Sequence, residues 1–117
     1  MTAAAGPVLC RFEDLADPDA RAFTIERDGR PLDIILVRSG DRVSAYVNRC
    51  PHAGSPLDWV PGQFLNLDRT HLQCATHDAL FTLESGECVA GPCVGDALEA
   101  VPVVVDGGAV RLQDPAS

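Results

Sequence analysis

The feature that most constrains this chain is a pair of short Cys–His motifs. Cys50-Pro51-His52 and Cys74-Ala75-Thr76-His77 each place one thiolate and one imidazole within reach of a single point, with 21 residues between His52 and Cys74. If both motifs bind the same metal centre, the fold must bring these two segments together. Two sulfur and two nitrogen ligands suit a [2Fe–2S] cluster held by two Cys and two His, and they could also hold a zinc ion.

The grouping of the ligands separates these two possibilities. A zinc finger pairs Cys with Cys and His with His, with the His pair on a helix, whereas each motif here contains one of each type. Pro51 and the following Gly54-Ser55-Pro56 stiffen the chain after the first pair, and the second pair lies at the end of an expected strand. The grouping favours iron–sulfur, and a zinc-stabilised Cys2His2 interaction domain is the alternative from another class.

Short alternating segments separated by Gly-bearing turns fill most of the chain and predict strands. Residues 50–66 are expected to form a long loop, and a single helical turn is expected near 13–20, interrupted by Pro18. This pattern predicts an all-β antiparallel sandwich or small barrel. The predicted strands cover residues 22–26, 32–37, 42–47, 71–74, 79–84, 88–89, 98–106 and 109–112.

Length and charge limit the function. With 117 residues, the chain is expected to be one domain, 1–117, too small to include a second catalytic domain. The formal net charge of −8 disfavours nucleic acid and suits a protein partner with a basic docking face. Apolar runs such as Val101–Val105 are too short to cross a bilayer, and no signal peptide is recognisable, so we expect a cytoplasmic protein without membrane contact.

The region around the motifs resembles the Rieske-type ferredoxins, the electron carriers of multicomponent ring-hydroxylating oxygenases. The similarity extends over roughly Val8 to Leu112. The resemblance implies a Rieske fold with a cluster-binding subdomain at approximately 48–94 and one Rieske [2Fe–2S] cluster per chain on Cys50, His52, Cys74 and His77. The matching residues in the cluster loops are Pro51, Gly54, Ser55, Pro56, Thr76, Phe81, Gly91 and Pro92.

The resemblance also implies a function. A chain of this family takes one electron from a flavin-dependent ferredoxin reductase and passes it to a terminal oxygenase, so it is a carrier without a small-molecule substrate of its own. An oxygenase would need a second iron held by two His and a carboxylate, and only His71 is left over. The small subunit of an assimilatory nitrite reductase is the alternative of similar fold, although that subunit commonly lacks the four ligands.

Departures from the family pattern predict the redox potential. The respiratory branch of the family has a disulfide between its ligand loops and two hydroxyl groups near the cluster sulfurs. The disulfide positions here are Ser55 and Ala75, and the hydroxyl positions are Ala79 and Phe81. Because hydrogen bonds to sulfur stabilise the reduced cluster, we expect a midpoint potential at the low end of the Rieske range of roughly −150 to +300 mV.

The remaining candidates have simpler interpretations. Cys10, Cys88 and Cys93 are expected to be buried thiols, although Cys88 and Cys93 flank Gly91-Pro92 and could form a redox pair. His71 is expected to be a surface or strand-packing histidine rather than a fifth ligand. Trp59 could contact a partner or pack under the long loop. The carboxylates around the motifs are expected to be solvated, and they are Asp58, Asp68 and Asp78.

Overall fold

A computed structural model describes residues 5–49, 51, 57, 64–66, 68–74 and 79–113. The part it describes contains nine strands and one short 3-10 helix. In chain order these are β1 (Ala5–Arg11), η1 (Phe12–Asp14), β2 (Asp19–Arg27), β3 (Arg30–Ser39), β4 (Arg42–Val47), β5 (His71–Gln73), β6 (Leu80–Thr82), β7 (Cys88–Ala90), β8 (Val103–Asp106) and β9 (Ala109–Gln113). Within these residues, no helix is long and apolar enough to cross a membrane.

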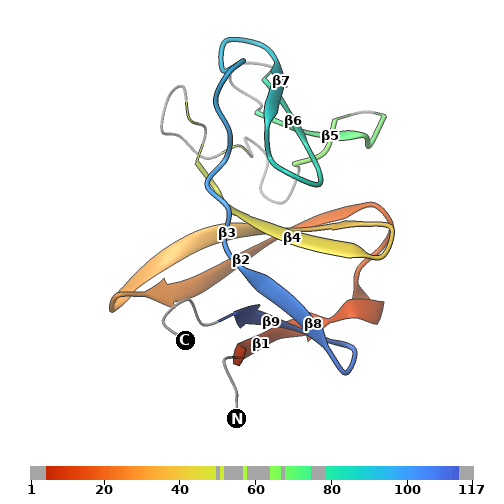
Figure 1. Ribbon diagram of the computed structural model, residues 1–117, viewed down its shortest axis with the longest axis vertical. Coiled ribbons are helices and arrows are strands. Elements are labelled where there is room, and N and C mark those ends of the chain that lie inside the picture. The colour runs from red at the N-terminus through yellow and green to blue at the C-terminus, as the bar shows by residue number, and fades with distance from the viewer. Residues whose placement is uncertain are drawn as a thin grey trace.

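The strands form three antiparallel sheets of three strands each, in the orders β1-β9-β8, β2-β3-β4 and β5-β6-β7. Figure 1 shows the sheets in succession along the longest axis, with β2-β3-β4 in the middle. We call the first two sheets the base, and we call the described residues within 64–98, which include β5, β6 and β7, the inserted lobe, because they lie between β4 and β8 in the chain. The lobe is at the opposite end of the molecule from β1 and β9.

Strand β3, the central strand of the middle sheet, is buried on both faces. Strand β3 contains four consecutive buried residues, whose side chains alternate between the two sides. Ile35 and Val37 pack toward the lobe, and Ile34 and Leu36 pack toward the β1-β9-β8 sheet, where Val110 is also buried. A strand covered on both faces has an uninterrupted apolar run, which is why this segment does not show the usual alternation of apolar and polar residues.

The core of the inserted lobe continues into the base. Tyr46 of β4 lies in the same buried cluster as Phe64, Leu72 and Phe81. That cluster also contains Cys74, Cys88 and Cys93. Lobe and base therefore share one apolar core, and the lobe cannot shift without disturbing it.

The predicted all-β antiparallel architecture is confirmed, with three corrections. The expected helical turn near 13–20 is only the 3-10 turn at 12–14, and β2 already begins at Asp19. The expected strand 98–106 is shorter, because its first residues cross from β4 toward β9 and only Val103–Asp106 is a strand. The loop predicted for 50–66 ends early, since Leu65 pairs with Leu72.

Candidate metal centre

Of the four predicted ligands, the described residues include Cys74. Cys50, His52 and His77 lie outside them, as do Gly54, Ser55, Pro56 and Thr76 among the predicted loop residues. The structure does place the residues at the ends of both ligand-bearing segments, together with Pro51, which is exposed in a turn. These flanking residues show how each ligand-bearing segment is held.

The second segment begins at Cys74, directly after β5. Its side chain has no exposed area and lies in the apolar core of the inserted lobe. The backbone N–H of Cys74 donates to the carbonyl of Ala79 at 2.9 Å, so this hydrogen bond closes the segment that contains the second Cys–His pair. A thiolate surrounded by apolar side chains suits a soft metal centre such as iron–sulfur and does not suit magnesium or calcium.

The first segment is closed in a similar way. The backbone N–H of Leu57 donates to Oδ1 of Asn48 at 2.8 Å, and Leu57 is fully buried. Asn48 is itself held to the base, because its backbone N–H donates to the carbonyl of Asp33 at 2.9 Å. Asn48 was not predicted as a site residue. Its only signal in the sequence is an amide side chain two residues before Cys50, which resembles an ordinary loop asparagine.

A third loop lies against the second segment. Gly91 has a φ of +92°, and a Cβ at this position would lie 2.8 Å from Cα of Ala79. Pro92 follows it and is exposed, whereas Phe81 is buried in the core of the lobe. The Gly91-Pro92 loop therefore packs directly on Ala79, at the end of the second ligand-bearing segment, and its place beside the cluster stays a prediction.

Two of the three other cysteines are buried as expected. Cys88 and Cys93 lie in the core of the lobe, and Sγ of Cys88 donates to the carbonyl of Ala90 at 3.2 Å. Cys10 is half-buried in the base, and burial, followed by the charge of Asp14, raises the pKa of its thiol. The described residues contain no group of three or more His, Cys, Asp or Glu that could hold a metal ion.

His71 and Asp68 also agree with the simpler interpretation. His71 is half-buried on β5, and its Nδ1 lies 2.8 Å from Oγ1 of Thr70. Asp68 is exposed. Asp58, Trp59 and Asp78 lie outside the described residues, so their interpretations stay predictions.

Comparison with known proteins identifies the family. Residues 7–104 match the Rieske [2Fe-2S] domain family. The chain is 29% identical to the ferredoxin of carbazole 1,9a-dioxygenase from Nocardioides aromaticivorans IC177, with a TM-score of 0.70 over 95% of this chain and 98% of that chain. A search of curated proteins finds no match.

Two further structures show the same fold at lower identity. One is a complex of reduced oxygenase and oxidized ferredoxin in carbazole 1,9a-dioxygenase, with 23% identity and a TM-score of 0.71 over 92% of each chain. The other is the terminal oxygenase of carbazole 1,9a-dioxygenase from the Nocardioides strain, with 23% identity and a TM-score of 0.72. The match covers 93% of this chain but only 29% of that oxygenase chain.

The chain thus belongs to the Rieske [2Fe-2S] domain family, and its fold is that of the Rieske-type ferredoxins of dioxygenase systems. Family membership decides between the two metal centres that the sequence left open, because the cofactor of this family is the Rieske [2Fe–2S] cluster and not zinc. The buried thiol of Cys74 and the two closed segments fit that cofactor.

Proposed function

We propose that this protein is a one-electron carrier that receives an electron from a flavin-dependent reductase and delivers it to a terminal oxygenase. The observation that carries this proposal is the similarity to a ferredoxin of a dioxygenase system over 98% of that ferredoxin, at 29% identity. The oxygenase match covers only 29% of its chain. The similarity therefore favours a carrier over an oxygenase, and nothing in it favours the nitrite reductase subunit.

The four ligands in this proposal are Cys50, His52, Cys74 and His77, within a cluster-binding subdomain at approximately 48–94. When bound, the cluster supplies the ability to accept and release one electron. The protein holds the two ligand-bearing segments closed at Asn48–Leu57 and Cys74–Ala79, and it surrounds the Cys74 thiol with apolar side chains that exclude water. Rigid, dry surroundings reduce the rearrangement that accompanies a change of charge.

The partner surface in this proposal lies around the Gly91-Pro92 loop. Among the described residues, Val89 on β7 and Val94 after it in the chain are large hydrophobic side chains that remain 47% and 63% exposed. Glu87 and Asp96 are exposed nearby in the chain. Apolar side chains bordered by carboxylates are typical of a surface that docks a protein with a basic rim.

Two measurements test the proposal in sequence. First, the isolated protein should be brown, contain about two irons and two acid-labile sulfides per chain, and take up one electron. A colourless protein with one zinc would contradict it. A midpoint potential well above +100 mV would contradict the low potential inferred from Ala79 and Phe81. Replacing His52 or Cys74 with Ala should abolish the cluster, whereas His71→Ala should leave its spectrum unchanged.

The second measurement concerns the direction of electron flow. The reduced protein is mixed without oxygen with the terminal oxygenase of the same organism, and its reoxidation is followed by absorbance. Rapid reoxidation, with hydroxylated product once oxygen and substrate are added, supports the proposal. Reoxidation by the nitrite reductase of that organism, but not by the oxygenase, would support the alternative function.

A further inference from the structure

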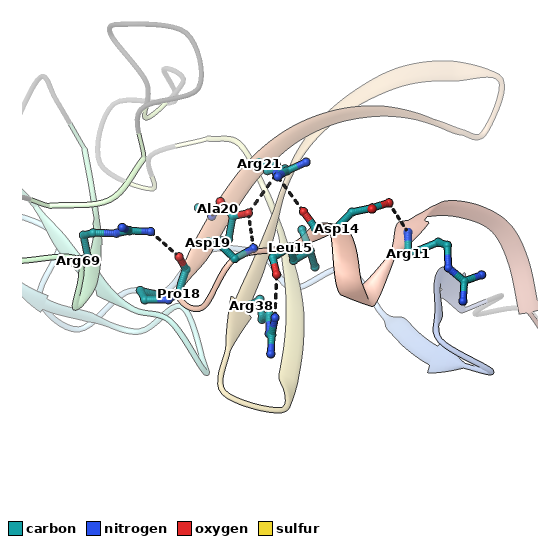
Figure 2. Close-up of polar contacts among 10 residues, drawn as sticks. Arg11, Asp14, Leu15, Pro18, Asp19, Ala20, Arg21, Arg38 and Arg69 are labelled. Atoms are coloured by element: carbon teal, nitrogen blue, oxygen red, sulfur yellow. Dashed lines mark hydrogen bonds and ion pairs between the residues drawn. The ribbon is translucent and has the colours of Figure 1, made fainter.

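We propose that Arg69 is a positioning residue that ties the chain leading into Cys74 to the base of the protein. Nη2 of Arg69 donates to the carbonyl oxygen of Pro18 at 2.7 Å (Figure 2), across 51 positions of sequence. Arg69 belongs to the inserted lobe, and Pro18 belongs to the loop between β1 and β2 of the base. The inference rests on the proposed role of Cys74 as a cluster ligand.

Arg69 lies at the tip of a short hairpin that ends at Cys74. One side of the hairpin is residues 64–66, and the other is β5. The backbone N–H of Gln73 donates to the carbonyl of Phe64 at 2.7 Å, and the N–H of Asn66 donates to the carbonyl of His71 at 3.0 Å. Because Cys74 follows β5 directly, the position of the hairpin determines the position of the Cys74 backbone.

The tip of this hairpin is internally rigid. Oδ1 of Asn66 accepts hydrogen bonds from the backbone N–H groups of Thr70 at 2.8 Å and His71 at 3.0 Å. The N–H of Arg69 donates to the carbonyl of Asn66 at 2.9 Å. Arg69 has a φ of +58°, in the left-handed region that residues other than glycine rarely adopt. Such a conformation persists where the surroundings determine it, so the turn fixes the direction in which the Cα–Cβ bond of Arg69 leaves the backbone.

The other end of the tie is rigid too. We call residues 12–19 the anchor segment. Nη1 of Arg38 donates to the carbonyl of Leu15 at 2.7 Å, and Nη2 of Arg21 donates to the carbonyl of Asp14 at 2.8 Å. Figure 2 shows Arg21, Arg38 and Arg69 each reaching a different carbonyl of this segment. Three guanidinium groups thus hold its backbone, and Arg69 alone among them comes from the lobe.

These contacts give Arg69 a specific role. A hydrogen bond can hold one element against another only when both of its ends are themselves fixed, and the contacts above fix both. Tyr46 holds the lobe through its buried core, whereas Arg69 holds the hairpin from its exposed tip. Arg69 therefore keeps the hairpin, and with it the Cys74 thiol, in one place relative to the base.

Hydrogen exchange of the cluster-loaded protein, followed by mass spectrometry, tests this role. In Arg69→Gln the shorter side chain cannot reach Pro18, and peptides covering residues 64–74 should exchange about fivefold faster, the factor expected for the loss of one hydrogen bond. Peptides from β3 should stay within about twofold of the wild type. The matched control is Arg30→Gln, which removes an exposed arginine from the first position of β3 and should leave exchange in 64–74 unchanged.

A second readout separates positioning from stability. The electron paramagnetic resonance spectrum of the reduced cluster depends on ligand geometry in folded molecules, and lower global stability alone does not change it. A broader spectrum in Arg69→Gln, together with local exchange, supports the inference. An unchanged spectrum, wild-type exchange in 64–74, or equal acceleration in β3 overturns it. Electron delivery to an oxygenase is a separate measurement, so its failure would contradict the proposed function without affecting the exchange result.

Discussion

The hydroxyl of Tyr46 donates a hydrogen bond to the backbone carbonyl of Leu83 at 2.8 Å. Both side chains are buried, and they belong to different parts of the molecule, since Tyr46 lies on β4 of the base and Leu83 lies in the turn after β6 of the inserted lobe. Tyr46 also forms a bridge with Ala100, where the chain returns from the lobe to the base. Tyr46 thus links the base both to the turn after β6 and to the segment that leads from the lobe back to the base.

Replacing Tyr46 with Phe is expected to reduce the free energy of unfolding by about 1–3 kcal/mol, because the ring still fills the core while the Leu83 carbonyl loses its partner in a buried place. Denaturant unfolding of the loaded protein measures the change. Thr24→Val is the control, since it removes the exposed hydrogen bond between Thr24 and Asp33 and should cost less. A loss of unfolding free energy smaller than that of Thr24→Val would contradict the predicted contribution of the Tyr46 hydroxyl.

Gly86 should tolerate no side chain, because two requirements coincide there. Its φ is +71°, and a Cβ would lie 2.7 Å from Cε1 of Tyr46. Gly29 in the β2–β3 turn has a similar φ of +77° with nothing within 4 Å of a Cβ, so it isolates the backbone requirement. We expect Gly29→Ala to cost about 1–2 kcal/mol and Gly86→Ala to cost a further 1–3 kcal/mol, roughly, from the clash with Tyr46. Equal losses of unfolding free energy would contradict the predicted clash.

The fold could be predicted from sequence where local patterns decide it. Alternation and Gly turns located β2, β3 and β4, and the grouping of Cys with His indicated an iron–sulfur site. Failures occurred where distant residues decide. Residues 99–101 were predicted as part of one strand with 103–106. The backbone N–H of Val47 donates to the carbonyl of Glu99, and the N–H of Val101 donates to the carbonyl of Ala45, so this stretch first contacts β4 and only afterwards pairs with β9. The local alternation of apolar and polar residues does not reveal such a change of partner strand.

The segment near 13–20 illustrates the same limit. Apart from the 3-10 hydrogen bond from the N–H of Leu15 to the carbonyl of Phe12, arginine side chains hold this segment. Its carbonyls at Asp14, Leu15 and Pro18 accept from arginines on β2, β3 and the hairpin tip. The tie from Arg69 spans 51 positions and could not be recognised without the fold. Likewise, Asn48 becomes a site residue only because Leu57 folds back onto it.

Ionisation of Tyr46 should occur above the ordinary tyrosine range. Burial, and then the charge of Glu84, raises its pKa above 10.0, with partial opposition from a hydrogen bond with Ser44. Tyr46 is the single tyrosine of the chain, so the absorbance of tyrosinate reports on it directly. The Tyr46 hydroxyl therefore ionises at lower pH in the unfolded chain than in the folded one. The stability linked to Tyr46 is therefore complete below pH 10.0 and decreases as pH rises through the folded pKa. A native titration midpoint at or below 10.0 would contradict this.

Val94 is expected to contribute to partner binding because it is the most exposed of the large hydrophobic side chains in the described residues, at 63%, and follows Pro92 by two positions. Val94→Ser should weaken the affinity for the terminal oxygenase by about fivefold, since partial burial of a valine at an interface is worth roughly 1 kcal/mol. Val8 on β1 is 49% exposed at the opposite end of the molecule, so Val8→Ser is the matched control and should change affinity less than about twofold. The Michaelis constant for the reduced carrier in oxygenase turnover measures both variants. If Val94→Ser leaves the Michaelis constant unchanged, the oxygenase does not dock at Val94, and an effect of Val8→Ser alone would place the docking surface on the base instead.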